Sequence, residues 1–280
     1  MQKIIKFAFQ GINGAYSEQA GKNVFPDAKS IACSTFEDMF ACVRNEKADV
    51  ALVPIENSQA GRVADTQRLI PDSDLNIIGE YFLEVKHNLL AIPGTKINEV
   101  KRIHSHEQGI AQCRNKIIEL NKEMVVAADT AGSAKKISEL KSKEEAAIAS
   151  VLAAEIYNLE VLENNFQDSK NNVTRFLIMS KKTRDINSSE KELLTTLVFV
   201  VRSIPASLYK CLGGFASNGV NITKLESYIH PQGFDVAQFY IDFEGHPDQD
   251  AVKLALDEMK FFCKEIKILG VYKKSEFRKK

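Results

Sequence analysis

The stretch VALVPIENSQAGRVADT, residues 50–66, decides the fold class, because it joins a short buried strand to a polar turn and a helix. Residues 50–55 are almost continuously apolar, as expected for a strand covered on both faces of a parallel sheet. Glu56, Asn57 and Ser58 follow at once. Ligands of open α/β sheets bind at the carboxyl ends of strands, so these side chains are candidates for a ligand site. The alternative is that Asn57 and Ser58 only cap a helix from about residue 62, although one capping residue would be enough.

The same alternation of strands and amphipathic helices extends over the first 180 residues and predicts an α/β fold with a largely parallel sheet. Residues 75–92 are apolar but interrupted by charges. We expect them to cross between two α/β lobes, with the return crossing after residue 160. The expected strands are 4–9, 50–55, 124–128, 146–150 and 175–179, and the expected helices are 17–25, 35–47, 107–120 and 130–140.

A second unit is expected after residues 180–192, a polar and charged segment typical of a linker. The order strand, helix, strand, strand, helix, strand in roughly 80 residues predicts a ferredoxin-like βαββαβ arrangement. Its expected elements are 193–201, a helix 206–219 ended by Gly219, a hairpin of 222–229 and 234–245 around HPQG (230–233), a helix 248–265 and a strand 266–272.

Composition excludes several function classes. The chain has 280 residues, with Lys+Arg and Asp+Glu both 37, and this balance argues against a nucleic-acid or membrane-surface partner. The five cysteines are scattered and show no metal-binding spacing, which predicts no metal site, reduced thiols and a cytoplasmic location. The N-terminal apolar run is too short for a signal peptide, and no run approaches the ~18 apolar residues of a membrane span.

Further polar groups follow other expected strands. GINGAYSE (11–18) is a tight turn in which Ser17 could cap the next helix, SHEQ (105–108) begins another helix, and DTAGSAK (129–135) a third. Thr174 and Arg175 begin the strand at 175–179. Hydroxyls, amides, helix starts and one Arg predict a pocket for a small anion. No phosphate loop, nucleotide fingerprint or Ser-His-Asp order is present, so we expect no cofactor. His87, in an apolar run, is expected to be a core histidine.

These segments, in order, closely resemble the prephenate dehydratase family, whose members convert prephenate to phenylpyruvate in phenylalanine biosynthesis. The resemblance implies a two-lobed, periplasmic-binding-protein-like catalytic domain (1–180, with lobes 1–85 plus 165–180 and 86–164), followed by an ACT regulatory domain (193–275). ACT domains usually pair, which implies a homodimer or homotetramer. The motifs that carry it are GINGAYSE (11–18), VPIENSQAGRV (53–63), SHEQGIAQC (105–113), DTAGSAK (129–135), AAIAS (146–150), NNVTRF (171–176) and GFASNGVNITKLES (214–227).

The resemblance also implies roles for residues that match the family's motifs. Thr174 would help hydroxide leave and Arg175 would anchor a carboxylate, so Arg175→Lys should mainly raise KM. Glu107 stands where the family usually has Pro, a change we expect to be tolerated. The implied catalytic residues are Thr174, Asn57 and Gln108, and the implied substrate-binding residues are Arg175, Glu56, Ser58, Ser105, His106, Thr130 and Phe176.

The second unit departs more from the family. Its usual Pro-Gly-Ala-Leu turn reads Pro-Ala-Ser-Leu at 205–208, and its Glu-Ser-Arg-Pro motif reads Glu-Ser-Tyr-Ile at 226–229. A Cβ at position 206 narrows the approach of a ligand to the backbone, and the loss of Arg removes a cation. We therefore expect the ACT fold and leave phenylalanine binding open. The implied effector-binding residues are Ala206, Ser207, Leu208, Asn221, Glu226 and Ser227.

Two alternatives remain open from the sequence. The chain could act on arogenate, the amino analogue of prephenate, because the two substrates differ only at the side-chain carbon. It could instead be a catalytically inactive amino-acid sensor or solute-binding module, although Thr174, Asn57 and Gln108 are retained.

Overall fold

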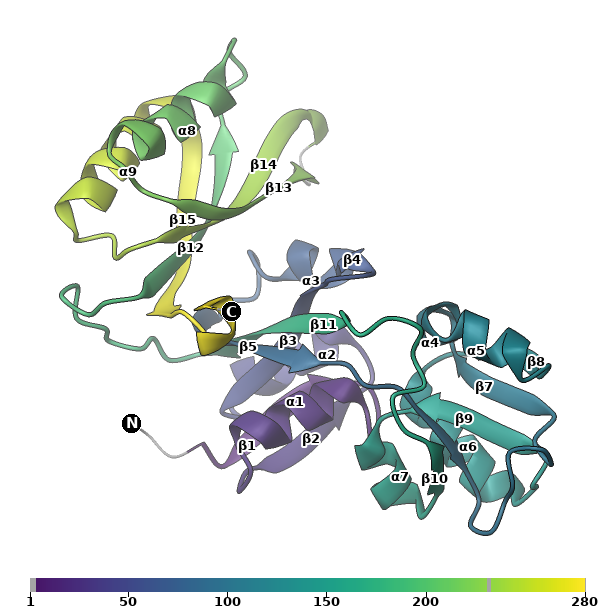
Figure 1. The fold of residues 1–280 in the computed structure, drawn as a ribbon. Coiled ribbons are helices and arrows are strands. Elements are labelled where there is room, and N and C mark those ends of the chain that lie inside the picture. Colours follow the sequence, from purple (N-terminus) through teal and green to yellow (C-terminus); the bar gives the residue numbers. More distant parts are fainter. Residues whose placement is uncertain (1–3, 231–232, 280) are drawn as a thin grey trace. The chain divides into compact units, whose positions relative to one another are not determined.

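The computed structural model describes residues 4–230 and 233–279 (Figure 1). The chain divides into two compact units. The first comprises residues up to Leu69 together with Tyr81–Phe176, and the second comprises Ile70–Glu80 together with the chain from Leu177 onward.

The first lobe is built on a sheet of order β2-β1-β3-β11-β5, with β4 paired to β3. Strand β1 runs parallel to β2 and to β3, and the five residues Val50–Val53 and Ile55 have no exposed surface, as the apolar run predicts. The elements are β1 (Lys6–Gln10), α1 (Tyr16–Val24), β2 (Lys29–Cys33), α2 (Phe36–Arg44), β3 (Val50–Asn57), β4 (Gly61–Arg62), α3 (Ala64–Leu69), β5 (Asn76–Glu84) and β11 (Val173–Ser180).

The second lobe is built on a sheet of order β10-β6-β9-β7-β8. Strand β7 is parallel to β8 and β9, but β6 is antiparallel to β9 and β10, so the expectation of a largely parallel sheet is wrong here. The reason is that β6 continues the crossing segment and enters the sheet from the opposite end. The elements are β6 (Asn88–Ala91), β7 (Arg102–His106), α4 (Glu107–Gln112), α5 (Arg114–Glu119), β8 (Glu123–Ala127), α6 (Thr130–Leu140), β9 (Glu145–Ala149), α7 (Val151–Tyr157) and β10 (Glu160–Glu163).

Two crossings join the lobes, as the sequence predicts. The first lies between β5 and β6, and the return lies between β10 and β11. They run side by side, because Val85 N–H donates to Asn172 O at 2.8 Å and Phe166 N–H donates to His87 O at 2.7 Å. The expected helix 107–120 is instead two short helices, since Cys113 has non-helical backbone angles (φ −119°, ψ 12°).

The second unit confirms the predicted βαββαβ order, as a sheet β13-β14-β12-β15 with antiparallel pairings. Phe199, Cys211, Phe215, Phe243 and Met259 are buried in its core. The middle of the expected HPQG turn, residues 231–232, lies outside the described residues. The elements are β12 (Leu193–Val201), α8 (Ser207–Ser217), β13 (Ile222–His230), β14 (Gly233–Glu244), α9 (Asp250–Phe262), β15 (Cys263–Lys273) and a final 3-10 turn (Glu276–Lys279).

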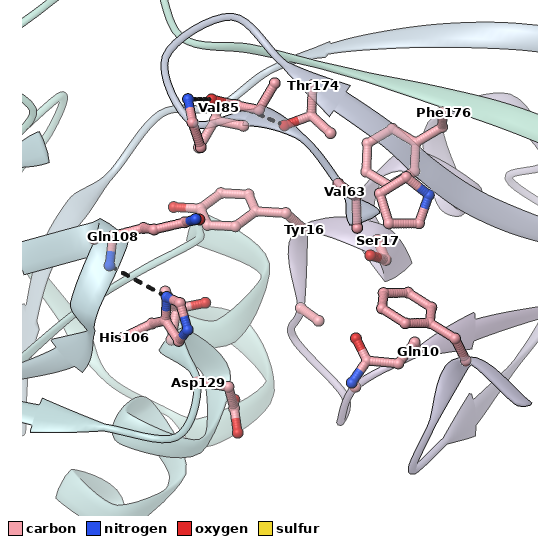
Figure 2. A pocket seen from close by; sticks show the side chains of 18 of the residues that line it. Gln10, Tyr16, Ser17, Val63, Val85, His106, Gln108, Asp129, Thr174 and Phe176 are labelled. Carbon is pink, nitrogen blue, oxygen red and sulfur yellow. Dashed lines mark hydrogen bonds between the residues drawn. The ribbon is translucent and has the colours of Figure 1, made fainter. Parts of the chain in front are cut away.

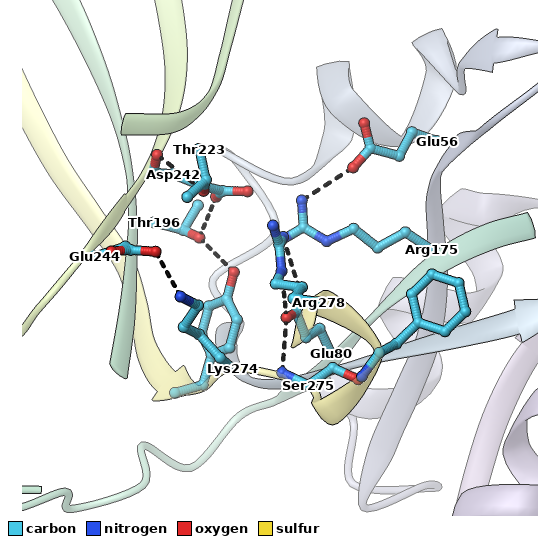
Figure 3. A network of polar contacts seen from close by, with 12 residues as sticks. Glu56, Glu80, Arg175, Thr196, Thr223, Asp242, Glu244, Lys274, Ser275 and Arg278 are labelled. Carbon is cyan, nitrogen blue, oxygen red and sulfur yellow. Dashed lines mark hydrogen bonds and ion pairs between the residues drawn. The ribbon is translucent and has the colours of Figure 1, made fainter. Parts of the chain in front are cut away.

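The segment Ile70–Glu80 belongs to the second unit, so that unit is larger than the expected 193–275. Glu80 is 9% exposed and makes a bidentate ion pair with Arg278 (2.7 and 3.0 Å), which Figure 3 shows together with the Ser275 N–H that also donates to Glu80. Lys267 Nζ donates to Pro71 O at 2.6 Å. These contacts join residues almost 200 positions apart, which is why local sequence patterns place the boundary elsewhere.

Candidate functional site

A cavity of about 970 Å³ lies in the first unit, with walls from both lobes (Figure 2). Strands β1, β3 and β11 and helix α1 supply the wall from the first lobe. Helices α4 and α6 supply the wall from the second. The cavity brings together six of the ten residues predicted for catalysis or substrate binding, namely Asn57, His106, Gln108, Thr130, Thr174 and Phe176.

Arg175 does not line the cavity, so the structure does not bring it together with Thr174 there, and its role as a carboxylate anchor stays a prediction. Successive side chains of a strand point to opposite faces, so Thr174 and Phe176 face the cavity and Arg175 points away. The Arg175 side chain is 1% exposed, and its Nη1 lies 3.1 Å from Oε1 of Glu56, which is also outside the lining (Figure 3). Arg175 and Glu56 therefore form a half-buried ion pair outside the cavity lining.

Ser58 and Ser105 also lie outside the cavity lining. Ser58 Oγ donates to Asn171 O and accepts from Val173 N–H, both at 2.9 Å, so it fixes the start of β11. Ser105 has no exposed surface and donates to Ile148 O at 2.8 Å. Both hydroxyls make hydrogen bonds within the fold.

Asn57 determines how the Thr174 hydroxyl points. Its Oδ1 accepts from the backbone N–H groups of Gln59 and Ala60, both at 2.9 Å, so its Nδ2 must face the other way. Nδ2 donates to Thr174 Oγ1 at 2.9 Å. Since Thr174 accepts this bond, its own proton remains available to a group in the cavity. Asn57 does not cap α3, which begins only at Ala64.

The hydrogen bonds continue from Asn57 through residues that the sequence did not single out as a site. Asn57 Nδ2 also donates to Asn172 Oδ1 at 2.8 Å, and Asn172 Nδ2 donates to Gln112 Oε1 at 2.8 Å. His87 Nε2 lies 2.7 Å from the same Gln112 oxygen, and His87 Nδ1 lies 2.8 Å from Tyr16 Oη. Gln112, Asn172, His87 and Tyr16 all line the cavity.

His87 is buried, with 3% of its surface exposed, as expected of a core histidine, but it also borders the cavity. Burial lowers the pKa of His87, whereas the hydrogen bond to Gln112 acts in the opposite direction. Burial likewise raises the pKa of Tyr16 well above its usual value. At neutral pH both side chains are therefore uncharged.

Residue spacing gives a partial signal that Asn172 and Gln112 belong to the site. Asn172 and Thr174 are two apart in an extended segment, and Gln108 and Gln112 are four apart on a helix, so the members of each pair lie on the same face.

Two helix starts border the cavity, and the uncapped start of α1 suits an anion. Helix α1 is not capped by Ser17, contrary to the prediction, because α1 begins at Tyr16 and no side chain caps it. Ala15, Tyr16 and Ser17 line the cavity there. Helix α6 begins at Thr130, and the preceding Asp129 caps it by accepting from Gly132 N–H at 2.5 Å.

Helix α4 begins next to the cavity as well. His106 caps it by accepting from Gln108 N–H at 3.2 Å, and Glu107 is exposed, as expected for a tolerated change.

Among residues 4–230 and 233–279, no cluster of three His, Cys, Asp or Glu side chains could hold a metal ion, and no helix is long and apolar enough to cross a membrane.

A second cavity, of about 530 Å³, lies at the turn from β12 to α8. Ala206, Ser207 and Leu208 line it, and Ala206 has a left-handed backbone (φ +62°). Of the remaining predicted effector residues, none lines this cavity: Asn221 and Ser227 are exposed, and Glu226 pairs with Lys224 at 3.0 Å.

Comparisons with known proteins agree with this architecture. A family model described as prephenate dehydratase matches residues 7–184. A Komagataeibacter europaeus protein named bifunctional N-acyl-homoserine lactone acylase/prephenate dehydratase is 44% identical, over 98% of this chain and 97% of that protein. An Arabidopsis thaliana arogenate dehydratase/prephenate dehydratase is 35% identical, over 96% of this chain and 72% of that protein. The crystal structure of an Arthrobacter aurescens prephenate dehydratase with L-Phe superposes with a TM-score of 0.87, at 32% identity, over 96% of this chain and 90% of that one.

Proposed function

The chain belongs to the prephenate dehydratase family, and on this premise we propose that it converts prephenate to phenylpyruvate in phenylalanine biosynthesis. The reaction takes up one proton and releases carbon dioxide and water as the ring becomes aromatic. An enzyme for it must hold the substrate's carboxylate groups, assist the departing hydroxide and keep water from the carboxylate that leaves.

The observation that carries the proposal is the bond from Asn57 Nδ2 to Thr174 Oγ1. Because Thr174 accepts this bond and lines the cavity, its own proton can be donated to the leaving hydroxyl oxygen. Gln108 lines the opposite wall, and its side-chain amide can supply a second hydrogen-bond donor beside the Thr174 hydroxyl (Figure 2). A threonine hydroxyl is too weak an acid to act alone, so Thr174 polarises the leaving group or passes on a proton.

Anchoring of the substrate falls to groups other than Arg175. The start of α1, which no side chain caps, borders the cavity, and Arg62 on β4 lines it as well. Val63, Val85 and Phe176 form apolar parts of the lining. A carboxylate held against these side chains is poorly solvated, which favours its loss as neutral carbon dioxide.

A second candidate substrate is arogenate, which has an ammonium group where prephenate has a keto oxygen. Asp65 at the start of α3 is exposed and lines the cavity, so its carboxylate could bind that ammonium. Asp65→Asn should then lower kcat/KM for arogenate and leave kcat/KM for prephenate unchanged or raised. An equal effect on both substrates would remove Asp65 as the basis of selection.

The C-terminal βαββαβ unit is proposed to act as an ACT domain that pairs in a homodimer or homotetramer and binds phenylalanine. Support comes from the cavity at Ala206 and from the Arthrobacter aurescens relative, which contains L-Phe. Calorimetric titration of the full chain with phenylalanine tests the binding, and light scattering gives the oligomeric state. The absence of binding heat at millimolar phenylalanine would contradict the regulatory proposal.

The enzymatic proposal is tested by assaying purified full-length protein with prephenate and with arogenate, following phenylpyruvate and phenylalanine. Turnover that is lost in Thr174→Ala supports it. Failure to turn over either substrate would favour the sensor interpretation. Hydrolysis of an N-acyl-homoserine lactone is measured in the same preparation, because the Komagataeibacter europaeus relative carries both names.

A further inference from the structure

We infer that Gln112 and Asn172 are positioning residues, which hold the Asn57 amide so that the Thr174 hydroxyl points at the substrate. The four side chains form a continuous chain of hydrogen bonds of 2.8–2.9 Å from α4 to β11. His87 and Tyr16 complete the chain at its far end. Asn172 is 1% exposed and His87 3%, so water competes little for these bonds.

The direction of every bond in this chain follows from two backbone groups. Gln59 and Ala60 N–H donate to Asn57 Oδ1, so Asn57 can only donate through Nδ2 to Asn172 Oδ1. Asn172 must then donate through its own Nδ2, which makes Gln112 Oε1 the acceptor. Gln112 Oε1 is an amide oxygen and has no proton, so it also accepts from its second neighbour, His87 Nε2.

The consequence for His87 is a defined tautomer. Because Gln112 Oε1 accepts, His87 must carry its proton on Nε2 and donate it across the 2.7 Å contact. Neutral His87 then has a bare Nδ1 that lies 2.8 Å from the Tyr16 hydroxyl, and this nitrogen shares the single hydroxyl proton with the Lys86 carbonyl at 3.1 Å. The backbone of the turn after β3 thus sets the position of a proton on the fourth side chain of the series Asn57, Asn172, Gln112 and His87.

The chain also joins the two lobes. Gln112 is the last residue of α4 in the second lobe, Asn172 lies in the return crossing, and Asn57 ends β3 of the first lobe. If the two lobes moved apart, the Gln112–Asn172 hydrogen bond would break. The hydrogen bonds that hold Asn172 against the Asn57 amide are therefore complete only when the lobes are in this arrangement.

The kinetic test compares two changes of the same size at position 112. Gln112→Leu removes the acceptor, and we expect kcat to fall about tenfold with KM within about twofold of wild type. Gln112→Glu keeps an acceptor oxygen for both Asn172 and His87, and we expect it to retain more than about a third of wild-type kcat. Equal losses of kcat in the two folded variants would overturn the positioning role, because a role in packing does not distinguish them.

A second readout needs no turnover and so separates this inference from the proposed dehydratase function on which it rests. In the full-length wild type above pH 7.5, ¹⁵N NMR of the ring of His87, assigned with His87→Gln, should show the proton on Nε2. In Asn172→Asp, residue 172 cannot donate, so Gln112 turns its amide group around and the proton should move to Nδ1. A wild-type proton on Nδ1, or an unchanged tautomer in Asn172→Asp, would overturn the inference even if prephenate is turned over.

Discussion

Asn57 and Thr174, which are 117 residues apart in the chain, are joined by a 2.9 Å hydrogen bond in which the amide donates and the hydroxyl accepts. The direction of this bond matters more than its length. A threonine that donated to its neighbour would have no proton left for the substrate, whereas this one keeps it.

Substitutions at Thr174 should follow the presence of the hydroxyl. We expect Thr174→Ala to lower kcat by about 10²–10³-fold, the usual loss for a donor to a developing oxyanion. Thr174→Ser should retain more activity, below wild type because serine lacks the branched Cβ that restricts χ1. Steady-state kinetics, with whichever of prephenate and arogenate the wild type converts, measures kcat for both variants. Equal kcat values for Thr174→Ala and Thr174→Ser would contradict a donor role.

Substitutions at Arg175 should affect stability more than substrate binding. Arg175→Met removes the ion pair with Glu56 outside the cavity lining, and the free energy of unfolding should fall by about 2–3 kcal/mol, less than for a fully buried pair because Glu56 is 32% exposed. KM should stay within about twofold of wild type. Urea unfolding with a double-mutant cycle that includes Glu56→Gln measures the coupling. A large rise in KM with unchanged stability would restore the anchor role.

The sequence predicts the strands and most of the cavity because both depend on local patterns. Continuous apolar runs place β3 and β11, and polar residues at strand ends place Asn57, Gln108 and Thr174. Arg175 is next to Thr174 in the sequence, but strand alternation places neighbouring side chains on opposite faces. Thr174 and Phe176, two residues apart, share the face that lines the cavity, and Arg175 lies on the other face.

The rest of the site could not be predicted, because it depends on contacts between distant segments. Gln112 and Asn172 are 60 residues apart, and each looks like an ordinary polar residue in its own segment. The same holds for Ile70–Glu80, which joins the second unit through Lys267 and Arg278. Periodicity and capping rules describe single elements and contain no information on such pairs.

Gly14 should be needed for the approach of the two lobes. It has φ +91°, and a Cβ there would lie 2.9 Å from Cα and Cβ of Ala153 on α7, where Ser150 Oγ also donates to Gly14 O at 2.6 Å. We expect Gly14→Ala to lower the free energy of unfolding by about 2–4 kcal/mol and to raise KM. Gly94→Ala is the matched control, since Gly94 has φ +76° but open space around it. It should cost only about 1–2 kcal/mol and leave KM unchanged. Similar effects of both variants would show that backbone strain alone matters.

His87 should make the stability of the fold pH-dependent below about pH 6.5. Burial lowers its pKa from the usual 6.5, so between that value and the lower native pKa the unfolded chain binds a proton that the folded chain does not. His87 therefore does not change the free energy of unfolding above about pH 6.5. As the pH decreases from 6.5 towards the lower native pKa, the proton bound by the unfolded chain lowers the free energy of unfolding. Urea unfolding from pH 7.5 to 5 should show a steeper decline for wild type than for His87→Gln. Parallel profiles would mean that His87 is protonated equally in both states.

Ala206 should be a strained position in the second unit. It precedes α8 with φ +62°, a conformation that costs an L-residue about 1–2 kcal/mol and glycine almost nothing. Ala206→Gly should raise the free energy of unfolding by about 0.5–1 kcal/mol after the greater flexibility of glycine in the unfolded chain is included. It should also widen the cavity at this turn, so calorimetry should find tighter phenylalanine binding in Ala206→Gly than in wild type. Gly219→Ala, at the φ +68° position after α8, is the inverse control and should lower stability without changing phenylalanine affinity. A destabilised Ala206→Gly would show that other contacts hold this turn in its left-handed conformation at no cost.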